Sequence, residues 1–164
     1  MSAPTLEPIA AQSPSTQESL RVMNNENARN TSFLTPAQWD SLIGTAFYGT
    51  CVLGPAALLI AFDHTARYDN DNFRWFAKRF SSFVYIDRVV VGADHRKRGL
   101  ANLLYLDLFD TAAKASHDIV VCEVNEVPPN PGSDAFHAKM GFSHVGSAEL
   151  SGGKHVRYLK KSLV

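Results

Sequence analysis

The 164-residue sequence has only two cysteines, no long uninterrupted apolar run and no excess of charge of either sign. Cys51 and Cys122 both lie in strand-like runs without a basic neighbour that would activate a thiol, so we predict that both are buried and unreactive. So few cysteines favour the reducing cytoplasm over a secreted, disulfide-rich fold. The N-terminus has no basic region followed by an apolar core, so no secretory signal is expected.

The longest apolar run, residues 52–62, is interrupted by Gly54 and Pro55 and is too short to cross a bilayer. Sixteen basic residues balance sixteen acidic ones, which leaves no overall field to attract nucleic acid. The sequence therefore predicts a soluble protein with neither a membrane nor a nucleic acid as its partner.

Periodicity predicts one folded α/β domain. Residues 1–17 are rich in Ala, Pro, Ser and Thr without a period, so we expect a flexible tail there and a single domain over 18–164. Short apolar and β-branched runs indicate strands, and apolar residues at helical spacing indicate helices. The predicted strands cover 20–23, 48–53, 57–62, 83–91, 119–124, 142–145 and 155–163, and the predicted helices cover 36–47, 99–117 and 131–140.

Turn and cap signals order these elements. Gly54-Pro55 between two strands predicts an antiparallel hairpin. Thr35-Pro36 and Asn130-Pro131 are typical of an N-cap followed by the first helical residue, and Gly141 is typical of a residue just past a helix. Strand 83–91, helix 99–117 and strand 119–124 follow one another, which predicts a parallel pair joined by a right-handed crossover.

The turn between strand 83–91 and the next helix combines small residues with positive charge. Free N–H groups at a helix start, together with Arg96, Lys97 and Arg98, suit a diphosphate, and Gly99 lets the backbone approach it. The turn lacks the Gly-Lys-Ser/Thr of a P-loop and the G-x-G-x-x-G of a dinucleotide site. The alternative is a basic surface turn without a ligand.

Two motifs in this region resemble those of the GNAT acetyltransferases. Arg96-x-x-Gly99-x-Ala101 after a valine-rich strand is similar to the family's Arg/Gln-x-x-Gly-x-Gly/Ala motif. Residues 130–142, with Asn130, an aromatic pair on a helix and Gly-Phe at the end, are similar to its second signature. Within the superfamily, residues 85–88 and 128–138 resemble a bacterial group of predicted acetyltransferases.

The resemblance implies an α/β (α+β) fold: a mixed, mostly antiparallel twisted sheet, a splayed central parallel pair that forms the cofactor cleft, and helices on both faces. It implies acetyl-coenzyme A as the cofactor. Backbone groups of Val89 and Val91 would pair with the pantetheine arm, and N–H groups of residues 98–101 would hold the pyrophosphate. The predicted cofactor-binding residues are Val89, Val90, Val91, Arg96, Lys97, Arg98, Gly99, Leu100, Ala101, Asn130, Ser133 and Phe136.

Transfer of an acetyl group to an amine needs a base that removes a proton from the amine. Glu123, on the second parallel strand, resembles the general-base glutamate of some family members, and burying a carboxylate there is costly without a purpose. A paired structural carboxylate is the alternative. Asp87 is the rival base, although an ion pair with Arg88 explains it equally well.

The leaving thiolate is helped by an acid. Many family members have a Tyr for this task at the position of His137, and an imidazole can donate a proton near neutral pH. His137 fits a packing or capping role equally well. Tyr85 and Tyr105 are alternative hydroxyls, with Tyr105 the more typical helix-packing residue. The predicted catalytic residues are Glu123, His137 and Asp87, and no metal is expected.

Aromatic residues are dense between Tyr68 and Phe80, where the family usually sets its specificity. These rings either wall an acceptor pocket or simply cover the sheet. The predicted substrate-pocket residues are Tyr68, Phe73, Trp75, Phe76, Tyr85 and Asn125. The predicted partner is a small-molecule or peptide amine, with a second copy of the chain as a further candidate.

The motifs favour an N-acetyltransferase that moves an acetyl group directly from coenzyme A to a primary amine. The changed residue at position 137 motivates a second hypothesis, a module that binds or senses acyl-coenzyme A without turning it over. A third hypothesis, a helix-turn-helix regulator that uses residues 39–47, is disfavoured by the neutral net charge.

Overall fold

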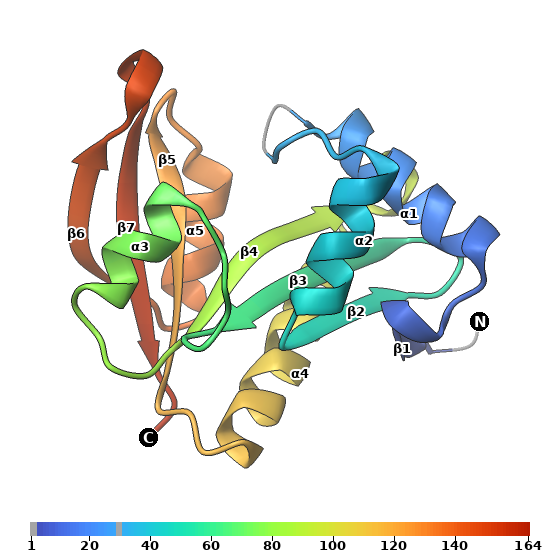
Figure 1. Ribbon diagram of the computed structural model, residues 1–164, viewed down its shortest axis with the longest axis horizontal. Coiled ribbons are helices and arrows are strands. Elements are labelled where there is room, and N and C mark those ends of the chain that lie inside the picture. The colour runs from blue at the N-terminus through green and yellow to red at the C-terminus, as the bar shows by residue number, and fades with distance from the viewer. Residues whose placement is uncertain (1–2, 29–30) are drawn as a thin grey trace.

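The computed structural model describes residues 3–28 and 31–164 and contains a single seven-stranded sheet. Its order is β1-β2-β3-β4-β5-β7-β6, and every neighbouring pair is antiparallel except β4 and β5 (Figure 1). The strands are β1 (Leu6–Pro8), β2 (Tyr48–Val52), β3 (Ala57–Asp63), β4 (Val84–Val91), β5 (Ile119–Val127), β6 (Ser143–Glu149) and β7 (His155–Ser162). The helices are α1 (Pro14–Glu26), α2 (Pro36–Thr45), α3 (Asp71–Ala77), α4 (Leu100–Lys114) and α5 (Pro131–Lys139).

Helices cover both faces of the sheet, as predicted. On one face, α1, α2 and α3 bury Leu20, Trp39 and Phe76 in a shared core (Figure 1). On the other face, α4 buries Leu104 and Leu108 against the sheet. The predicted mixed, mostly antiparallel sheet with a central parallel pair is therefore confirmed. Within the described residues, no helix is long and apolar enough to span a membrane.

Local sequence signals define several helix ends. The Thr35 hydroxyl accepts a hydrogen bond from the backbone N–H of Gln38 at 3.2 Å, and the Gln38 side chain accepts one from the Thr35 N–H at 2.9 Å. Asn130 caps α5 by accepting from the Ser133 N–H at 3.3 Å. Gly141 follows α5 with a φ of 91°, a left-handed conformation that favours glycine. The predicted caps are confirmed.

The predicted tail over residues 1–17 and the predicted strand at 20–23 are wrong within the described residues; residues 1–2 lie outside them. Residues 6–8 form β1, which pairs with β2, and Ile9 is completely buried. Residues 14–26 form α1, which begins at a Ser13 cap and a proline in its first turn. This segment is ordered because the edge of β2 offers hydrogen bonds and one face of α1 buries Leu20 and Met23.

Candidate active site

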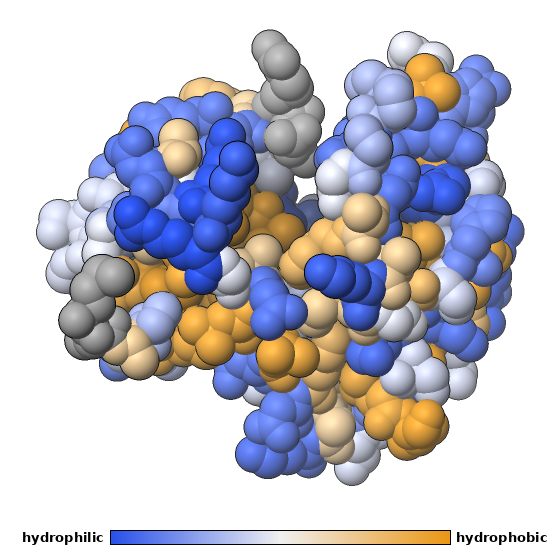
Figure 2. Space-filling model, turned by 180° about the vertical axis from the view of Figure 1, so that it is seen from behind, coloured by the Kyte–Doolittle hydropathy of each residue, from blue (hydrophilic) through white to orange (hydrophobic). Residues whose placement is uncertain are grey.

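The parallel strands β4 and β5 are paired only at their first residues. The register joins Val84 to Val120 and Tyr85 to Val121, whereas β4 continues to Val91 and β5 to Val127. Beyond Tyr85 the two strands diverge and open a cavity of about 290 Å³ between them, which we call the cleft cavity. It is lined by Thr31, Ile86, Asp87, Arg88, Val89, Tyr105, Cys122, Glu123, Val124, Asn125, Asn130, Ser133, His137 and Lys154. From behind, the surface is notched between the α1 side and the β6–β7 side (Figure 2).

A β-bulge in β4 turns two charged residues toward this cavity. Arg88 lies opposite Ile60 and Ile86 lies opposite Ala61, so Asp87 is one extra residue on β4. Successive residues of a regular strand point to opposite faces, and a bulge removes that alternation. Asp87 and Arg88 therefore both line the cleft cavity, and both side chains are almost completely buried.

The loop between β4 and α4 offers unpaired backbone donors. In the described part of the chain, the N–H groups of residues 97–101 donate to no other backbone group. Gly99 stands at the N-cap of α4 with a φ of 73°, and a Cβ built on it would meet no heavy atom within 4 Å. Lys97 also has a positive φ, 61°. This arrangement, which we call the anion cradle, suits a negatively charged group, as helix N-termini generally do.

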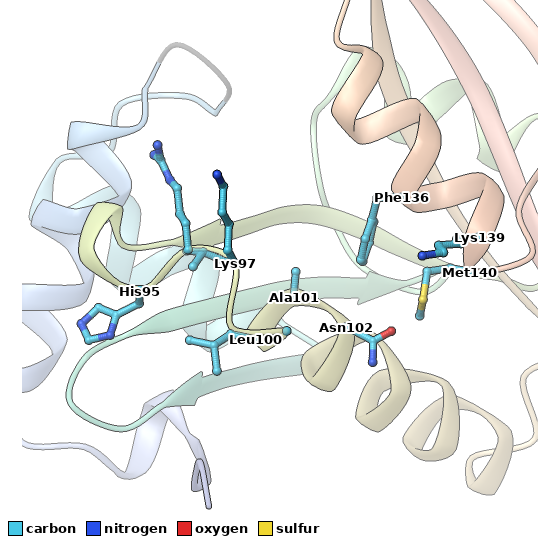
Figure 3. A pocket seen from close by; sticks show the side chains of 11 residues that line it. His95, Lys97, Leu100, Ala101, Asn102, Phe136, Lys139 and Met140 are labelled. Carbon is cyan, nitrogen blue, oxygen red and sulfur yellow. The ribbon is translucent and has the colours of Figure 1, made fainter. Parts of the chain in front are cut away.

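A second cavity of about 620 Å³, the loop cavity, lies between this loop and α5. Phe136 reaches from α5 toward Ala101 on the first turn of α4 (Figure 3). The described residues that line it include basic side chains and no carboxylate, which suits a phosphate-bearing ligand. The lining residues are Val91, His95, Arg96, Lys97, Gly99, Leu100, Ala101, Asn102, Phe136, Lys139 and Met140.

The two cavities bring together most of the predicted cofactor-binding residues. Seven of them, Val91, Arg96, Lys97, Gly99, Leu100, Ala101 and Phe136, line the loop cavity. Val89, Asn130 and Ser133 line the cleft cavity. Arg98 instead lines a neighbouring cavity bounded by residues 3–5, and the Val90 side chain is buried in the core on the α1–α3 face. The Val90 side chain therefore does not face either cavity, and only its backbone remains a predicted contact to the cofactor.

Glu123 has the properties of a base that works at neutral pH. Its carboxylate oxygens lie 2.9 and 2.8 Å from the Tyr85 hydroxyl, which donates to them. Burial raises the pKa of Glu123 to about 7, although the hydrogen bond from Tyr85 opposes the rise. A carboxylate with this pKa is half ionised near neutrality and can accept a proton from an amine.

Asp87 is less available for proton transfer than Glu123. One of its oxygens accepts a hydrogen bond from the Tyr68 hydroxyl, and the other accepts from Arg88 Nε at 2.7 Å. Arg88 also donates to the Asn24 side chain at 3.0 Å and to the Ser32 carbonyl at 3.2 Å. Asp87 therefore belongs to a buried network that joins the sheet to α1 and the α1–α2 connection, which disfavours it as the base.

His137 is buried and both of its ring nitrogens are engaged. Nδ1 lies 2.8 Å from the Ser133 carbonyl, which can only accept, so Nδ1 carries the proton. Nε2 then accepts from the Tyr105 hydroxyl at 2.8 Å. Burial lowers the pKa of His137 and raises that of Tyr105 well above its ordinary value. This geometry disfavours the predicted role of His137 as the acid, because neither group points a free proton into the cleft.

Most of the predicted substrate-pocket aromatics pack against the sheet. Phe73 and Phe76 are buried in the core, and Trp75 stacks on Tyr158 of β7 with ring centroids 4.1 Å apart. Tyr68 and Tyr85 lie behind the cleft, where they hold Asp87 and Glu123. Of the six predicted residues, Asn125 lines the cleft cavity. The interpretation of the aromatics as a sheet cover fits this packing better.

The cleft cavity also contains residues that the sequence analysis did not select. Thr31 comes from the α1–α2 connection, and Lys154 comes from the connection between β6 and β7. Tyr105 was considered only as an alternative hydroxyl. Gly152 and Gly153 before Lys154 signal a tight turn, but no local pattern says that this turn returns to the cleft.

Replacement of Gly99 with leucine is expected to weaken coenzyme A binding at least tenfold by titration calorimetry, because the new side chain occupies the open space above the N–H groups. The left-handed φ adds strain of about 1–2 kcal/mol. Gly152→Leu is the matched control, since Gly152 has a φ of 81° and equally open space but lies outside the loop cavity. If the Gly99 variant and the control bind coenzyme A with equal affinity, the anion cradle is not part of the cofactor site.

Comparisons with known proteins agree with this geometry. Residues 8–142 match the model of the acetyltransferase (GNAT) family. The chain is 41% identical over 61 residues to a phosphinothricin N-acetyltransferase of Streptomyces coelicolor, a match that covers 37% of this chain and about a third, 34%, of that protein.

Solved structures share the fold over nearly the whole chain. One is the NatC complex bound to Gag peptide and CoA, with a TM-score of 0.77 at 11% identity over 99% of this chain and 100% of the matched chain. Another is Arabidopsis thaliana NAA60 in complex with acetyl-CoA, with a TM-score of 0.74 at 15% identity over 98% and 99% of the two chains. With the family model matching most of its length, the chain belongs to the acetyltransferase (GNAT) family.

Proposed function

We propose that the protein transfers an acetyl group from acetyl-coenzyme A directly to the primary amine of an acceptor, with Glu123 as the general base. The observation that carries the proposal is the Glu123 carboxylate, which lines the cavity where β4 and β5 diverge and accepts a hydrogen bond from Tyr85. Burial there raises its pKa to about 7. The residues present suit the cofactor, because the loop cavity is basic and free N–H groups lie at the start of α4. When bound, acetyl-coenzyme A supplies the acetyl group as a reactive thioester.

The chain's own residues divide the remaining work. The loop at residues 97–101 holds the diphosphate, and the unpaired edge of β4 around Val89 and Val91 orients the pantetheine arm. Glu123 takes the proton that the amine loses as its C–N bond forms. Tyr85 holds the carboxylate in place through its hydrogen bond.

The geometry supports departure of the sulfur as a thiolate that takes its proton from water. The Tyr105 hydroxyl donates its hydrogen bond to His137 Nε2, and loss of that proton would leave a buried ring nitrogen without a donor. An ordinary thiol has a pKa of about 8.5, so a thiolate is an adequate leaving group near neutral pH. The hydrogen bond between His137 and Tyr105 is then structural: it joins α5 to α4.

Tyr105→Phe is accordingly expected to change kcat by less than about threefold, while costing about 1–3 kcal/mol of unfolding free energy because His137 Nε2 loses its donor. Steady-state kinetics and urea unfolding measure the two effects. A fall in kcat of about a hundredfold or more would instead assign the acid role to Tyr105.

The test of the proposed function is release of free thiol from acetyl-coenzyme A in the presence of a panel of amines, with mass spectrometry of the acetylated product. Acceptor-dependent thiol release supports the transferase. Tight cofactor binding without turnover for any amine supports the second candidate, a module that senses acyl-coenzyme A. The observation that favours this candidate concerns His137. It occupies the position where the family often has its acid, and both of its ring nitrogens are hydrogen-bonded.

A further inference from the structure

Among the described residues, four charged side chains line the cleft cavity, and two of them neutralise each other. Asp87 and Arg88 form a buried ion pair of 2.7 Å, with the remaining donors of Arg88 directed to Asn24 and Ser32. The two charges left for a ligand are Glu123, which acts as the base, and Lys154. The cavity therefore offers one proton acceptor and one uncommitted cation.

The backbone turn before Lys154 places this residue at the mouth of the cleft. The turn before it contains Gly152 and Gly153, both with positive φ, and the Leu150 N–H donates to the Lys154 carbonyl at 2.7 Å. Lys154 directly precedes His155, which lies opposite Val127 at the end of β5. This places it on the strand pair that carries Glu123, toward the open end of the cavity.

The Lys154 ammonium has no partner of its own in the part of the chain that the structure describes. Neither an ion pair nor a side-chain hydrogen bond involves it there, and the residue is exposed. Its charge is felt inside the cleft, since it lowers the pKa of Glu123 against the larger effect of burial. A simple amine that enters protonated is repelled by this cation, whereas a molecule that also carries an anion is attracted to it.

We propose that the acceptor is a small amine that also carries an acid group, such as a free amino acid, with its amine directed to Glu123 and its anion bound by Lys154. This inference rests on the proposed function and names the substrate class of the same site. Glu123 and Lys154 line the same cavity, so the amine and the acid group of one small molecule can reach both of them.

The test compares free amino acids with their carboxamides, which keep the amine and lose the anion. The wild-type protein is expected to prefer the acid about tenfold in kcat/KM, the effect of one charge-assisted hydrogen bond. Lys154→Met is expected to remove this preference, chiefly through a higher KM for the acid, and Lys154→Arg to restore it. Lys78→Met, at an exposed lysine beside α3, is the control and should keep the preference.

Two further readouts separate this inference from the proposed function. Calorimetry on the coenzyme A complex measures acid and carboxamide binding without turnover. If the acid binds better than the carboxamide in a Lys154-dependent way but no thiol is released, the proposed transferase activity is contradicted and the anion site at Lys154 is supported. If the wild-type protein has equal kcat/KM for acid and carboxamide, the proposed substrate class is overturned and the transferase activity is supported. Better turnover of a peptide amine than of any free amino acid would lead to the same conclusion.

Discussion

Glu123→Gln is expected to lower kcat by about 10²–10⁴-fold, the usual contribution of a general base, while leaving coenzyme A affinity unchanged. Glutamine keeps the shape of the side chain and can still accept from the Tyr85 hydroxyl, but it has no basic oxygen for the amine proton. Glu123 lines the cleft cavity and does not line the loop cavity, so the cofactor's phosphates should bind as before. Steady-state kinetics and calorimetry separate the two effects.

The same residue predicts the pH profile. A base acts when it is deprotonated, and burial raises the pKa of Glu123 to about 7. For the wild-type protein, kcat should therefore fall about tenfold per pH unit below pH 7 and level off above it. The residual activity of Glu123→Gln should lack this acid limb.

Glu126→Gln is the matched control, because Glu126 lies on the same strand and is exposed. It should keep both the wild-type kcat and the acid limb. If Glu123→Gln keeps the wild-type pH profile, Glu123 is a structural carboxylate and the base lies elsewhere in the cleft.

Signals that are local in the sequence predicted the turn and the helix start at the loop cavity. Gly99, the basic residues before it and the start of α4 lie within a few residues of one another, so the turn chemistry can be read directly. The same holds for Asn130, which caps α5 three residues before its partner. Ser13-Pro14 was an equally clear cap that the compositional argument for a tail concealed.

Contacts between distant elements could not be predicted in this way. Tyr105 and His137 are 32 residues apart on α4 and α5, and their hydrogen bond depends on how these helices meet. The bulge at Asp87 is equally hidden, because it is a property of the pairing of β4 with β3 and not of either strand alone. Which groups in the cleft donate or accept protons depends on such contacts, which explains why the sequence alone could not assign these roles.

Arg88→Met is expected to cost about 3–5 kcal/mol of unfolding free energy, the largest stability effect predicted for this chain. The Asp87 and Arg88 side chains are each 4% exposed, so loss of the guanidinium leaves a buried carboxylate with the Tyr68 hydroxyl as its remaining partner. The hydrogen bonds to Asn24 and Ser32 disappear with it. Urea unfolding measures the loss, and Arg67→Met, at an exposed loop residue, should change stability by less than about 0.5 kcal/mol.

The double variant Asp87→Asn/Arg88→Met decides whether the cost arises from the unpaired charge. If it does, the neutral asparagine recovers a substantial part of the loss, and the double-mutant cycle gives a coupling energy of at least about 1 kcal/mol. Additive effects would mean that Arg88 acts through Asn24 and Ser32 alone. Because the network joins the bulge of β4 to α1 and the α1–α2 connection, recovery in the double variant would show that the pair is there to neutralise a buried charge at this wall of the cleft, and lack of recovery would show that the guanidinium's hydrogen bonds hold the wall.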